Sequence, residues 1–269
     1  MLNQQNIELY LRTLIAQGMS ENTIRAYRAD LEGLNTFIEA DPFGNQSLEA
    51  WAAAYLNEGR INWAAKTTCR KLGTFRSYAK WLGQPTWLAT YRPPTPATQQ
   101  PHPIPEGIDG IQAMIDRTRN PLHKALLALN GLLGLRIDEV IHVRTDHFDL
   151  HEMTLKVRGK GDKTRIVPVS SRAWAAIKPR YDACANANLS HLVPYSNRGA
   201  RKAVSRHGRN ADLSRHVASH DLRATALTAA YDKTKDLRAV QEIAGHTDPR
   251  TTMVYTKISM DAMRGALDL

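Results

Sequence analysis

Apolar residues recur at helical spacing through residues 1–91 of the chain. Two stripes open the sequence, each with the period of about 3.6 residues that marks one buried face of a helix. Their positions are Ile7, Leu11, Leu14 and Ile15 in the first stripe, and Tyr27, Leu31, Leu34 and Phe37 in the second. Ser20 is a suitable N-cap for the second helix, and two further helical patterns cover residues 48–56 and 67–82. The pattern predicts an all-helical domain over residues 1–91.

A second pattern begins after residue 105. Asn120-Pro121 combines an N-cap with a first-turn proline, and the segment that follows, residues 122–135, is apolar almost all round. This segment is predicted to be the central helix of a core. Residues 152–157 then alternate apolar and polar side chains, which predicts a half-buried strand, and residues 164–169 are a second strand candidate.

The loop between these two strands, residues 159–163, predicts a hairpin, and helical periodicity returns from Ser219 onward. The predicted fold class is therefore mainly α with a small antiparallel β-sheet. Residues 92–105, RPPTPATQQPHPIP, are rich in proline and predict a stiff, extended linker. The chain is thus expected to form a helical domain (1–91), a linker (92–105) and a second domain (106–269).

Composition changes this picture in two ways. The formal charge of +10 favours an anionic polymer as the partner. The two cysteines, Cys69 and Cys184, are too few for a disulfide framework or a zinc ribbon, which fits a reducing cytoplasm. Neither a run of eighteen apolar residues nor a signal-peptide pattern is present, so we expect neither membrane insertion nor export.

Basic residues fall into two groups that could contact nucleic-acid phosphates. The first lies on helical segments of residues 1–91, and the second lies in the basic stretch 195–216. The candidates are Arg25, Arg28, Lys66, Arg70, Lys71, Arg76 and Lys80 in the first group, and Arg198, Arg201, Lys202, Arg206 and Arg209 in the second. The alternative for the first group is a solvated surface, and for the second a mobile, solvated loop.

Four places in residues 106–269 carry side chains suited to chemistry. Arg136 follows an apolar helix, Lys160 lies between two glycines, His220 and Arg223 are one helical turn apart, and His246 precedes Tyr255 by nine residues; each alone also has an ordinary structural explanation. Together they offer guanidinium groups for a phosphate, proton carriers and a phenolic nucleophile. A cluster of carboxylates is missing, which argues against two-metal phosphoryl transfer.

Other kinds of site are less well supported by the sequence. The spacing of His142, His147 and His151 is not a common zinc pattern, so we expect no metal site. The segment RGKGDKT lacks the GK[ST] ending of a phosphate-binding loop. Ser219, His220 and Asp221 are consecutive, whereas a hydrolase triad converges from separate elements.

Four segments in order, LGLRIDEV, RGKGDKTRIVPV, HDLRAT and AGHTDPRTTMVYTKI, resemble the tyrosine recombinase family, which includes phage integrases and Xer-type recombinases. They span residues 133–258. The resemblance implies that residues 1–91 are a helical core-binding domain and that residues 106–269 are an α+β catalytic domain. It also implies cleavage without a cofactor or metal.

The resemblance assigns the main chemical roles. Arg136 and Arg223 would clamp the scissile phosphate, Lys160 would protonate the leaving 5'-oxygen, and Tyr255 would form a 3'-phosphotyrosyl link.

Three further residues receive supporting roles from the same resemblance. His220 would act as an acid/base partner, His246 would hydrogen-bond the phosphate, and Glu139 would organise the arginines. Asp138 departs from the family pattern, which has a small or hydroxyl residue there.

The function implied is site-specific DNA recombination, for phage or mobile-element integration. The alternatives are chromosome dimer resolution of the Xer type, a type IB topoisomerase and a non-cleaving DNA-binding regulator. Expected partners are duplex recombination sites, three further copies of the chain in a synaptic tetramer, and an accessory DNA-bending or directionality factor, with cytoplasmic, nucleoid-associated localisation. Residues 256–269 would dock on a neighbouring protomer or on their own domain.

Overall fold

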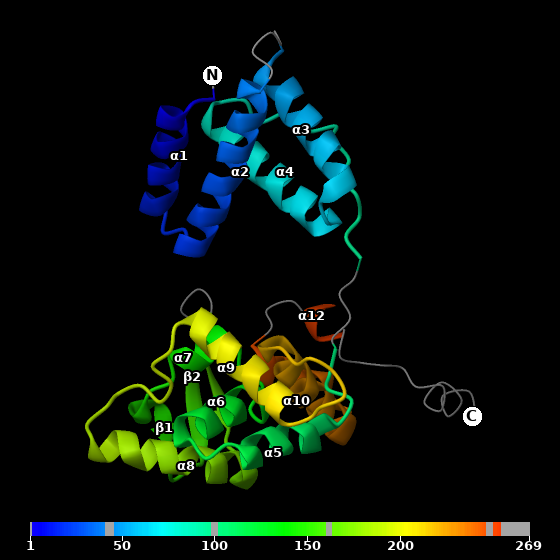
Figure 1. Cartoon of the computed structure of the whole chain (residues 1–269). Helices are drawn as coiled ribbons and strands as arrows, with labels where there is room; N and C mark the ends of the chain where they lie inside the picture. Colours follow the sequence, from blue (N-terminus) through cyan, green and yellow to red (C-terminus); the bar gives the residue numbers. More distant parts are fainter. Residues whose placement is uncertain (1, 41–45, 98–101, 160–162, 246–249, 254–269) are drawn as a thin grey trace, which may run out of the picture. The chain divides into compact units, whose positions relative to one another are not determined.

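The computed structural model describes residues 2–40, 46–97, 102–159, 163–245 and 250–253 (Figure 1). The chain divides into two compact units, residues 1–99 and 100–269. Each unit has its own apolar core, formed in the first by residues such as Ile7, Leu31 and Phe75, and in the second by residues such as Leu126 and Leu155. Among the helices described, none combines the length and apolar character needed to span a bilayer.

The first unit consists of four described helices. They are α1 (Gln4–Ala16), α2 (Glu21–Glu39), α3 (Leu48–Asn62) and α4 (Ala65–Trp81). The predicted cap of α2 is confirmed, because the Ser20 side chain accepts a hydrogen bond from the Thr23 backbone N–H. The helical prediction for this region is therefore confirmed, although α3 runs to Asn62, beyond the predicted end at residue 56.

One apolar position of α1 was assigned to the wrong face. Ile15 is 58% exposed, whereas Tyr10 is 1% exposed and completes the buried face with Ile7, Leu11 and Leu14. At 100° per residue, Ile15 lies about 80° round the helix from Ile7, at the edge of the stripe. The aromatic ring of Tyr10 packs instead, stacked against Tyr27 and edge-on to Tyr78.

Helices make up most of the second unit. They are α5 (Gly107–Arg117), α6 (Pro121–Gly131), α7 (Ile137–Ile141), α8 (Ser171–Asn186), α9 (Asn197–Asn210), α10 (Ser219–Thr234), α11 (Leu237–Ala244) and α12 (Arg250–Met253), with a 3-10 turn, η1 (Thr145–His147). The predicted cap of α6 is confirmed, since Asn120 accepts from the Leu122 N–H and Pro121 occupies the first turn. Helix α6 packs against α5, α8, α9 and α10, which makes it the centre of the core.

Helix α6 ends earlier than the apolar run suggested. The run continues to Leu135, but the helix stops at Gly131, and Gly134 has a left-handed backbone (φ +67°). The Leu135 N–H returns to the Leu129 carbonyl, which closes the turn. This turn places Arg136 at the N-cap position of α7.

The sheet has three antiparallel strands in the order β1-β2-β3, namely β1 (Phe148–Asp149), β2 (Thr154–Arg158) and β3 (Thr164–Pro168). The two predicted strands are confirmed, and they pair with Leu155 opposite Val167 and Val157 opposite Arg165. Leu155, Val157 and Val167 are buried. The two-residue strand β1 was not predicted, because alternation cannot be recognised over so short a length.

Helices α8 and α9 were not predicted either. Helix α9 occupies the basic stretch for which a solvated loop was the alternative, and that alternative is wrong. Its buried face consists of the small residues Ala200, Ala203 and Val204 together with His207. Small apolar residues between arginines give a weak hydrophobic signal, although their spacing is helical.

Two histidines, His207 of α9 and His123 of α6, pack together. The rings of His123 and His207 lie 4.8 Å apart, and His123 Nε2 is 2.9 Å from the Tyr195 hydroxyl. Burial, with the neighbouring charges of His123 and Arg206, lowers the pKa of His207 to about 4. In the unfolded chain this histidine becomes protonated as the pH falls below about 6.5. In the folded chain it stays neutral until about pH 4.

This difference predicts acid destabilisation that begins below about pH 6.5. Between pH 7 and pH 5 the free energy of unfolding should fall by roughly 1–2 kcal/mol more in the wild type than in a His207→Gln variant. Urea denaturation at the two pH values measures both losses. The variant His151→Gln, at an exposed histidine, should keep the wild-type loss. Equal losses in the wild type and His207→Gln would contradict the assignment.

Candidate active site

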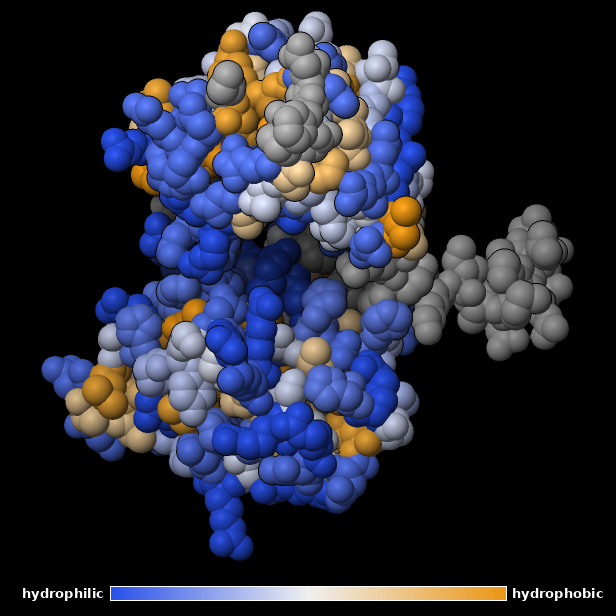
Figure 2. All heavy atoms as spheres, turned by 45° about the horizontal axis from the view of Figure 1, so that its top comes forward, coloured by the Kyte–Doolittle hydropathy of each residue, from blue (hydrophilic) through white to orange (hydrophobic). Residues whose placement is uncertain are grey.

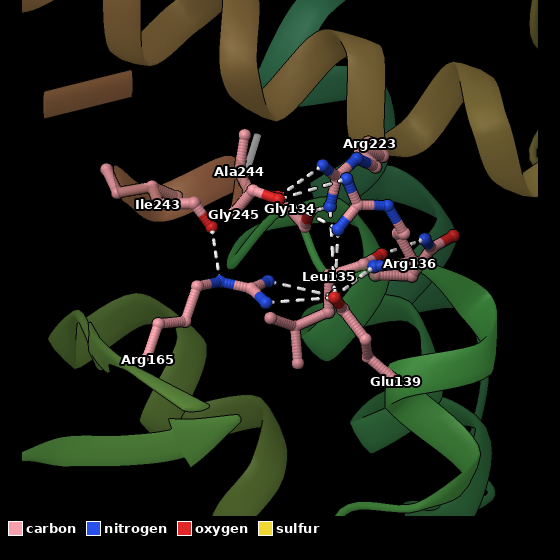
Figure 3. A network of polar contacts seen from close by, with 10 residues as sticks. Gly134, Leu135, Arg136, Glu139, Arg165, Arg223, Ile243, Ala244 and Gly245 are labelled. Carbon is pink, nitrogen blue, oxygen red and sulfur yellow. Dashed lines mark hydrogen bonds and ion pairs between the residues drawn. The ribbon is translucent and has the colours of Figure 1, made fainter. Parts of the chain in front are cut away.

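Glu139 is the centre of a network of polar contacts in the second unit (Figure 3). It lies in the first turn of α7, where its Oε2 accepts the Arg136 backbone N–H at 2.8 Å. A carboxylate at this position satisfies an amide that the helix itself leaves unpaired. The Glu139 side chain is only 4% exposed.

Three arginines from three separate elements surround this carboxylate. Arg165, from β3, binds both carboxylate oxygens, with Nη1 to Oε1 at 2.9 Å and Nη2 to Oε2 at 2.8 Å. Arg136, just before α7, donates from Nη1 to Oε1 at 3.0 Å. Arg223, from α10, places Nη1 at 3.8 Å from Oε2. Figure 3 shows the three guanidinium groups converging on Glu139 from different sides.

Burial and the arginines act in opposite directions on this carboxyl group. Burial alone raises the pKa of Glu139, but the hydrogen bond and charge of Arg165, the Arg136 N–H and the Arg136 charge outweigh it, so the pKa is lowered. Glu139 is therefore ionised at neutral pH. With three guanidinium groups against one carboxylate, the cluster keeps an excess of positive charge.

The same arginines also donate to the carbonyl groups at the end of α11. Arg165 Nε donates to the Ile243 carbonyl at 2.9 Å. The Ala244 carbonyl accepts from Arg136 Nη1 at 3.0 Å and from Arg223 Nη2 at 2.7 Å. The last carbonyls of a helix have no partner within the helix and carry partial negative charge. The arginines thus anchor the C-terminal end of α11 against α7, α10 and β3.

Arg136 and Arg223 differ in exposure. The Arg136 side chain is 41% exposed, whereas that of Arg223 is 3% exposed and also donates to the Gly134 carbonyl at 2.6 Å. Because both donate to the single oxygen of Ala244, their guanidinium groups lie close enough to share one small anion. The paired N–H donors of two such guanidinium groups match the non-bridging oxygens of a phosphate.

The structure brings together three of the residues singled out in the sequence, namely Arg136, Arg223 and Glu139. His220 is exposed in the first turn of α10, one turn before Arg223. The other three predicted catalytic residues, Lys160, His246 and Tyr255, lie outside the described residues, as does the tail 256–269.

Arg165 belongs to this cluster and was not predicted. A signal was present in the sequence. Arg165 and Val167 are two residues apart in β3 and therefore lie on the same face of the strand, and Val167 is buried. A basic residue on the inward face of a strand requires a buried anion as partner. The partner, Glu139, lies 26 residues earlier in the chain.

The basic candidates of the first unit are largely engaged by its own acidic residues. Arg25 pairs with Glu21, Arg28 with Glu8, and Arg70 with Asp30. Arg76 donates to the carbonyls of Leu88 and Tyr91, whereas Lys66 and Lys80 are exposed.

Lys71 corrects the prediction for this group. It was placed on an exposed face, but it is buried, with Nζ 3.2 Å from Asp30 Oδ1 and over the rings of Tyr55 and Trp63. The buried Asp30 carboxylate requires a positive partner, which draws the lysine inward. Lys71 is therefore not a DNA-contact candidate.

The basic candidates of α9 are placed differently. All five are exposed, and within the described part of the chain none of them forms an ion pair; they are Arg198, Arg201, Lys202, Arg206 and Arg209. Helix α9 contains no acidic residue. Most of the surface of the second unit that is visible in Figure 2 is hydrophilic. Helix α9 therefore presents uncompensated positive charge to an anionic partner.

The three histidines considered for a metal do not form a site. His142 contacts the Asp138 carbonyl, His147 accepts from the Arg144 N–H, and His151 pairs with Glu152. No group of three or more potential ligands for a metal occurs among the described residues.

Residues 109–261 match the phage integrase family, and residues 7–84 match the N-terminal SAM-like domain of phage integrases. The chain is 28% identical to tyrosine recombinase XerC of Alcanivorax borkumensis, over 98% of this chain and 92% of the relative.

Two solved structures share the fold. One is the XerH site-specific recombinase bound to its difH substrate, with a TM-score of 0.69, 20% identity, and coverage of 91% of this chain and 79% of that one. The other is the Tn1549 transposon integrase in complex with transposon right-end DNA, with a TM-score of 0.67, 16% identity, and coverage of 98% of both chains.

Because Arg223 is more buried than Arg136, replacing each by alanine should lower the free energy of unfolding by different amounts. Arg223→Ala removes the arginine donor of the Gly134 carbonyl and one of the two donors of the Ala244 carbonyl from a buried place, and should lower the free energy of unfolding by about 2–3 kcal/mol. Arg136→Ala should cost under about 1 kcal/mol, because its partly exposed contacts can be replaced by water. Urea denaturation without DNA measures both. Equal losses would show that burial does not distinguish the two side chains.

Proposed function

The chain belongs to the phage integrase family of tyrosine recombinases, and we propose that it breaks and rejoins DNA at defined sites with Tyr255 as the nucleophile. The observation that carries the proposal is the convergence of Arg136 and Arg223 on the Ala244 carbonyl oxygen, at 3.0 and 2.7 Å. Two guanidinium groups that share one oxygen are spaced to hold one phosphate.

In the proposed reaction, these arginines bind the non-bridging oxygens of the scissile phosphate and stabilise the added charge of the pentacoordinate transition state. The phenolic oxygen of Tyr255 attacks phosphorus and forms a 3'-phosphotyrosyl ester, while Lys160 protonates the departing 5'-oxygen. His220 assists proton transfer and His246 hydrogen-bonds the phosphate. Attack by a 5'-hydroxyl on the ester restores the DNA and releases the tyrosine.

The proposed substrate is duplex DNA with two recombination sites. The XerH and Tn1549 proteins named above were solved with substrate or DNA bound, which supports a DNA partner for this chain. We assign the phosphate-binding surface of the second unit to α9, whose cations form no ion pair with any residue that the structure describes. We further propose that four copies of the chain assemble on two sites and that an accessory factor sets the direction of the reaction. The proposed place of action is the nucleoid.

Two biological roles fit this chemistry. Integration of a phage or mobile element is the first, and the match to an integrase family supports it. Chromosome dimer resolution is the second, because the relative named above is an XerC recombinase. Exchange between two separate sites, rather than relaxation of one plasmid alone, distinguishes either role from that of a type IB topoisomerase.

The nucleophile is tested with a suicide substrate, a duplex nicked near the crossover site so that the covalent complex accumulates. The wild type should form an adduct that denaturing gel electrophoresis detects, whereas Tyr255→Phe should form none, because the attacking oxygen is absent. Tyr231→Phe removes a hydroxyl from α10 and should leave the adduct intact. An adduct with Tyr255→Phe would refute the assignment.

The role of α9 is tested by charge removal. Arg201→Gln combined with Lys202→Gln should reduce the slope of log Kd against log salt by about 2, since each phosphate contact contributes close to 1. The matched control, Arg172→Gln with Lys178→Gln on α8, removes the same charge from another exposed surface. Salt titrations by fluorescence anisotropy measure both slopes. Equal reductions would mean that net charge, not α9, determines binding.

A further inference from the structure

The side chain of Arg165 joins three elements that lie far apart in the sequence. It leaves β3, binds Glu139 of α7 through Nη1 and Nη2 at 2.9 and 2.8 Å, and binds the Ile243 carbonyl of α11 through Nε at 2.9 Å. The side chain is 11% exposed. Figure 3 shows it reaching the cluster from the side opposite Arg136.

The donors of Arg165 are used differently from those of Arg136. Both terminal nitrogens of Arg165 face the Glu139 carboxylate, and Nε faces a backbone carbonyl, so the guanidinium is directed at protein acceptors. Arg136 gives the carboxylate one nitrogen and is 41% exposed. Arg165 is therefore not placed to hold a phosphate itself, and any effect on the reaction must pass through its neighbours.

One neighbour is the turn that ends α11. Gly245 has a left-handed backbone (φ +60°), and a Cβ there would lie 2.9 Å from Arg165 Nη1 and 3.1 Å from Cδ and Cζ. The turn thus lies directly against the Arg165 side chain. Because the preceding carbonyl, that of Ala244, is the oxygen shared by Arg136 and Arg223, the position of Arg165 determines where those two guanidinium groups meet.

The other neighbour is Glu139 itself. The bidentate pair with Arg165 satisfies a carboxylate that also lies 3.0 Å from Arg136 and 3.8 Å from Arg223. If Arg165 were absent, this buried charge would draw the other two arginines toward itself. Donors needed for a phosphate would then be taken up by the protein.

We propose that Arg165 is a positioning residue for DNA cleavage, which holds Arg136 and Arg223 in place by satisfying Glu139 and by fixing the end of α11. The inference rests on the proposed function, since it assigns Arg165 to the same site. It differs from a role in folding, because the affected step is cleavage after DNA has bound.

Arg165→Lys is the sharpest single change, since lysine keeps the charge but cannot form the two-pronged contact and reach Ile243 as well. Adduct formation with saturating suicide substrate should slow about 100-fold, the cost of a small misplacement of reacting groups. The Kd for DNA should change by less than about threefold, because the positive charge is retained. Each variant is assayed well below its melting temperature.

The matched control is Arg180→Lys. Arg180, on α8, also donates from Nε to a backbone carbonyl distant in the sequence, that of Leu192 at 2.8 Å, but the structure records no contact between it and Glu139. Its adduct formation should equal that of the wild type. A wild-type rate in Arg165→Lys, a similar slowing in Arg180→Lys, or a loss confined to DNA affinity would overturn the proposal.

A double variant tests the route through Glu139. Glu139→Gln removes the carboxylate that holds Arg165 and Arg136 in place, so it should give the same loss of cleavage with intact binding. The combination with Arg165→Lys should then be slower than Arg165→Lys alone by less than about threefold, because the two residues act as one unit. Multiplicative losses would refute this route. Should Arg165→Lys fail to fold, Glu139→Gln alone must show the split between cleavage and binding, and an intact cleavage rate would reject the proposal.

The same assays separate this inference from the proposed function. An adduct with the wild type and none with Tyr255→Phe establishes the function whatever Arg165→Lys does. Absence of an adduct with the wild type would reject both.

Discussion

One buried carboxylate, that of Glu139, determines how the second unit can assemble. At 4% exposure, an ionised carboxylate is costly unless it is paired and hydrogen-bonded. The pairing comes from β3, from the start of α7 and from α10, through Arg165, Arg136 and Arg223. Arg223 in turn is buried and Arg165 is largely so, and both require an anion. The sheet and the two helices therefore meet around this charge as well as in the apolar core.

The same arrangement that stabilises the fold prepares the chemistry. Three guanidinium groups exceed one carboxylate, so the cluster remains attractive to a further anion. The N–H groups of Arg136 and Arg223 that Glu139 does not bind donate to the carbonyls of Gly134, Ala244 and Gly245, which carry only partial charge. A phosphate diester, with a full negative charge, is the stronger acceptor. For Arg136 and Arg223, a bound phosphate would therefore be a stronger partner than the backbone carbonyls, while Arg165 would keep its contacts with Glu139 and Ile243.

Positive charge is distributed unequally between the two units. In the first unit, acidic residues take up much of it, most completely where buried Asp30 binds Lys71. In the second, the five cations of α9 are opposed by no acidic residue of that helix. Long-range attraction of DNA is therefore expected to come mainly from the second unit, while the proposed role of Arg136 and Arg223 at Glu139 is to bind one phosphate. Whether a basic residue attracts DNA from a distance or binds a single phosphate thus depends on its burial and its ion pairs, and not on how many basic residues each unit has.

The sequence by itself determined the features that depend on near neighbours. Ser20 and Asn120 cap their helices, and the alternation around Leu155 and Val157 forms a strand, because each is decided within a few residues. The ordered motifs also singled out Arg136, Glu139 and Arg223, which the structure brings together. Only the tertiary structure decided that Lys71 is buried and that Arg165 joins the cluster. Their partners, Asp30 and Glu139, are distant in the chain, and a pairing between distant charges exists only after folding has brought them together.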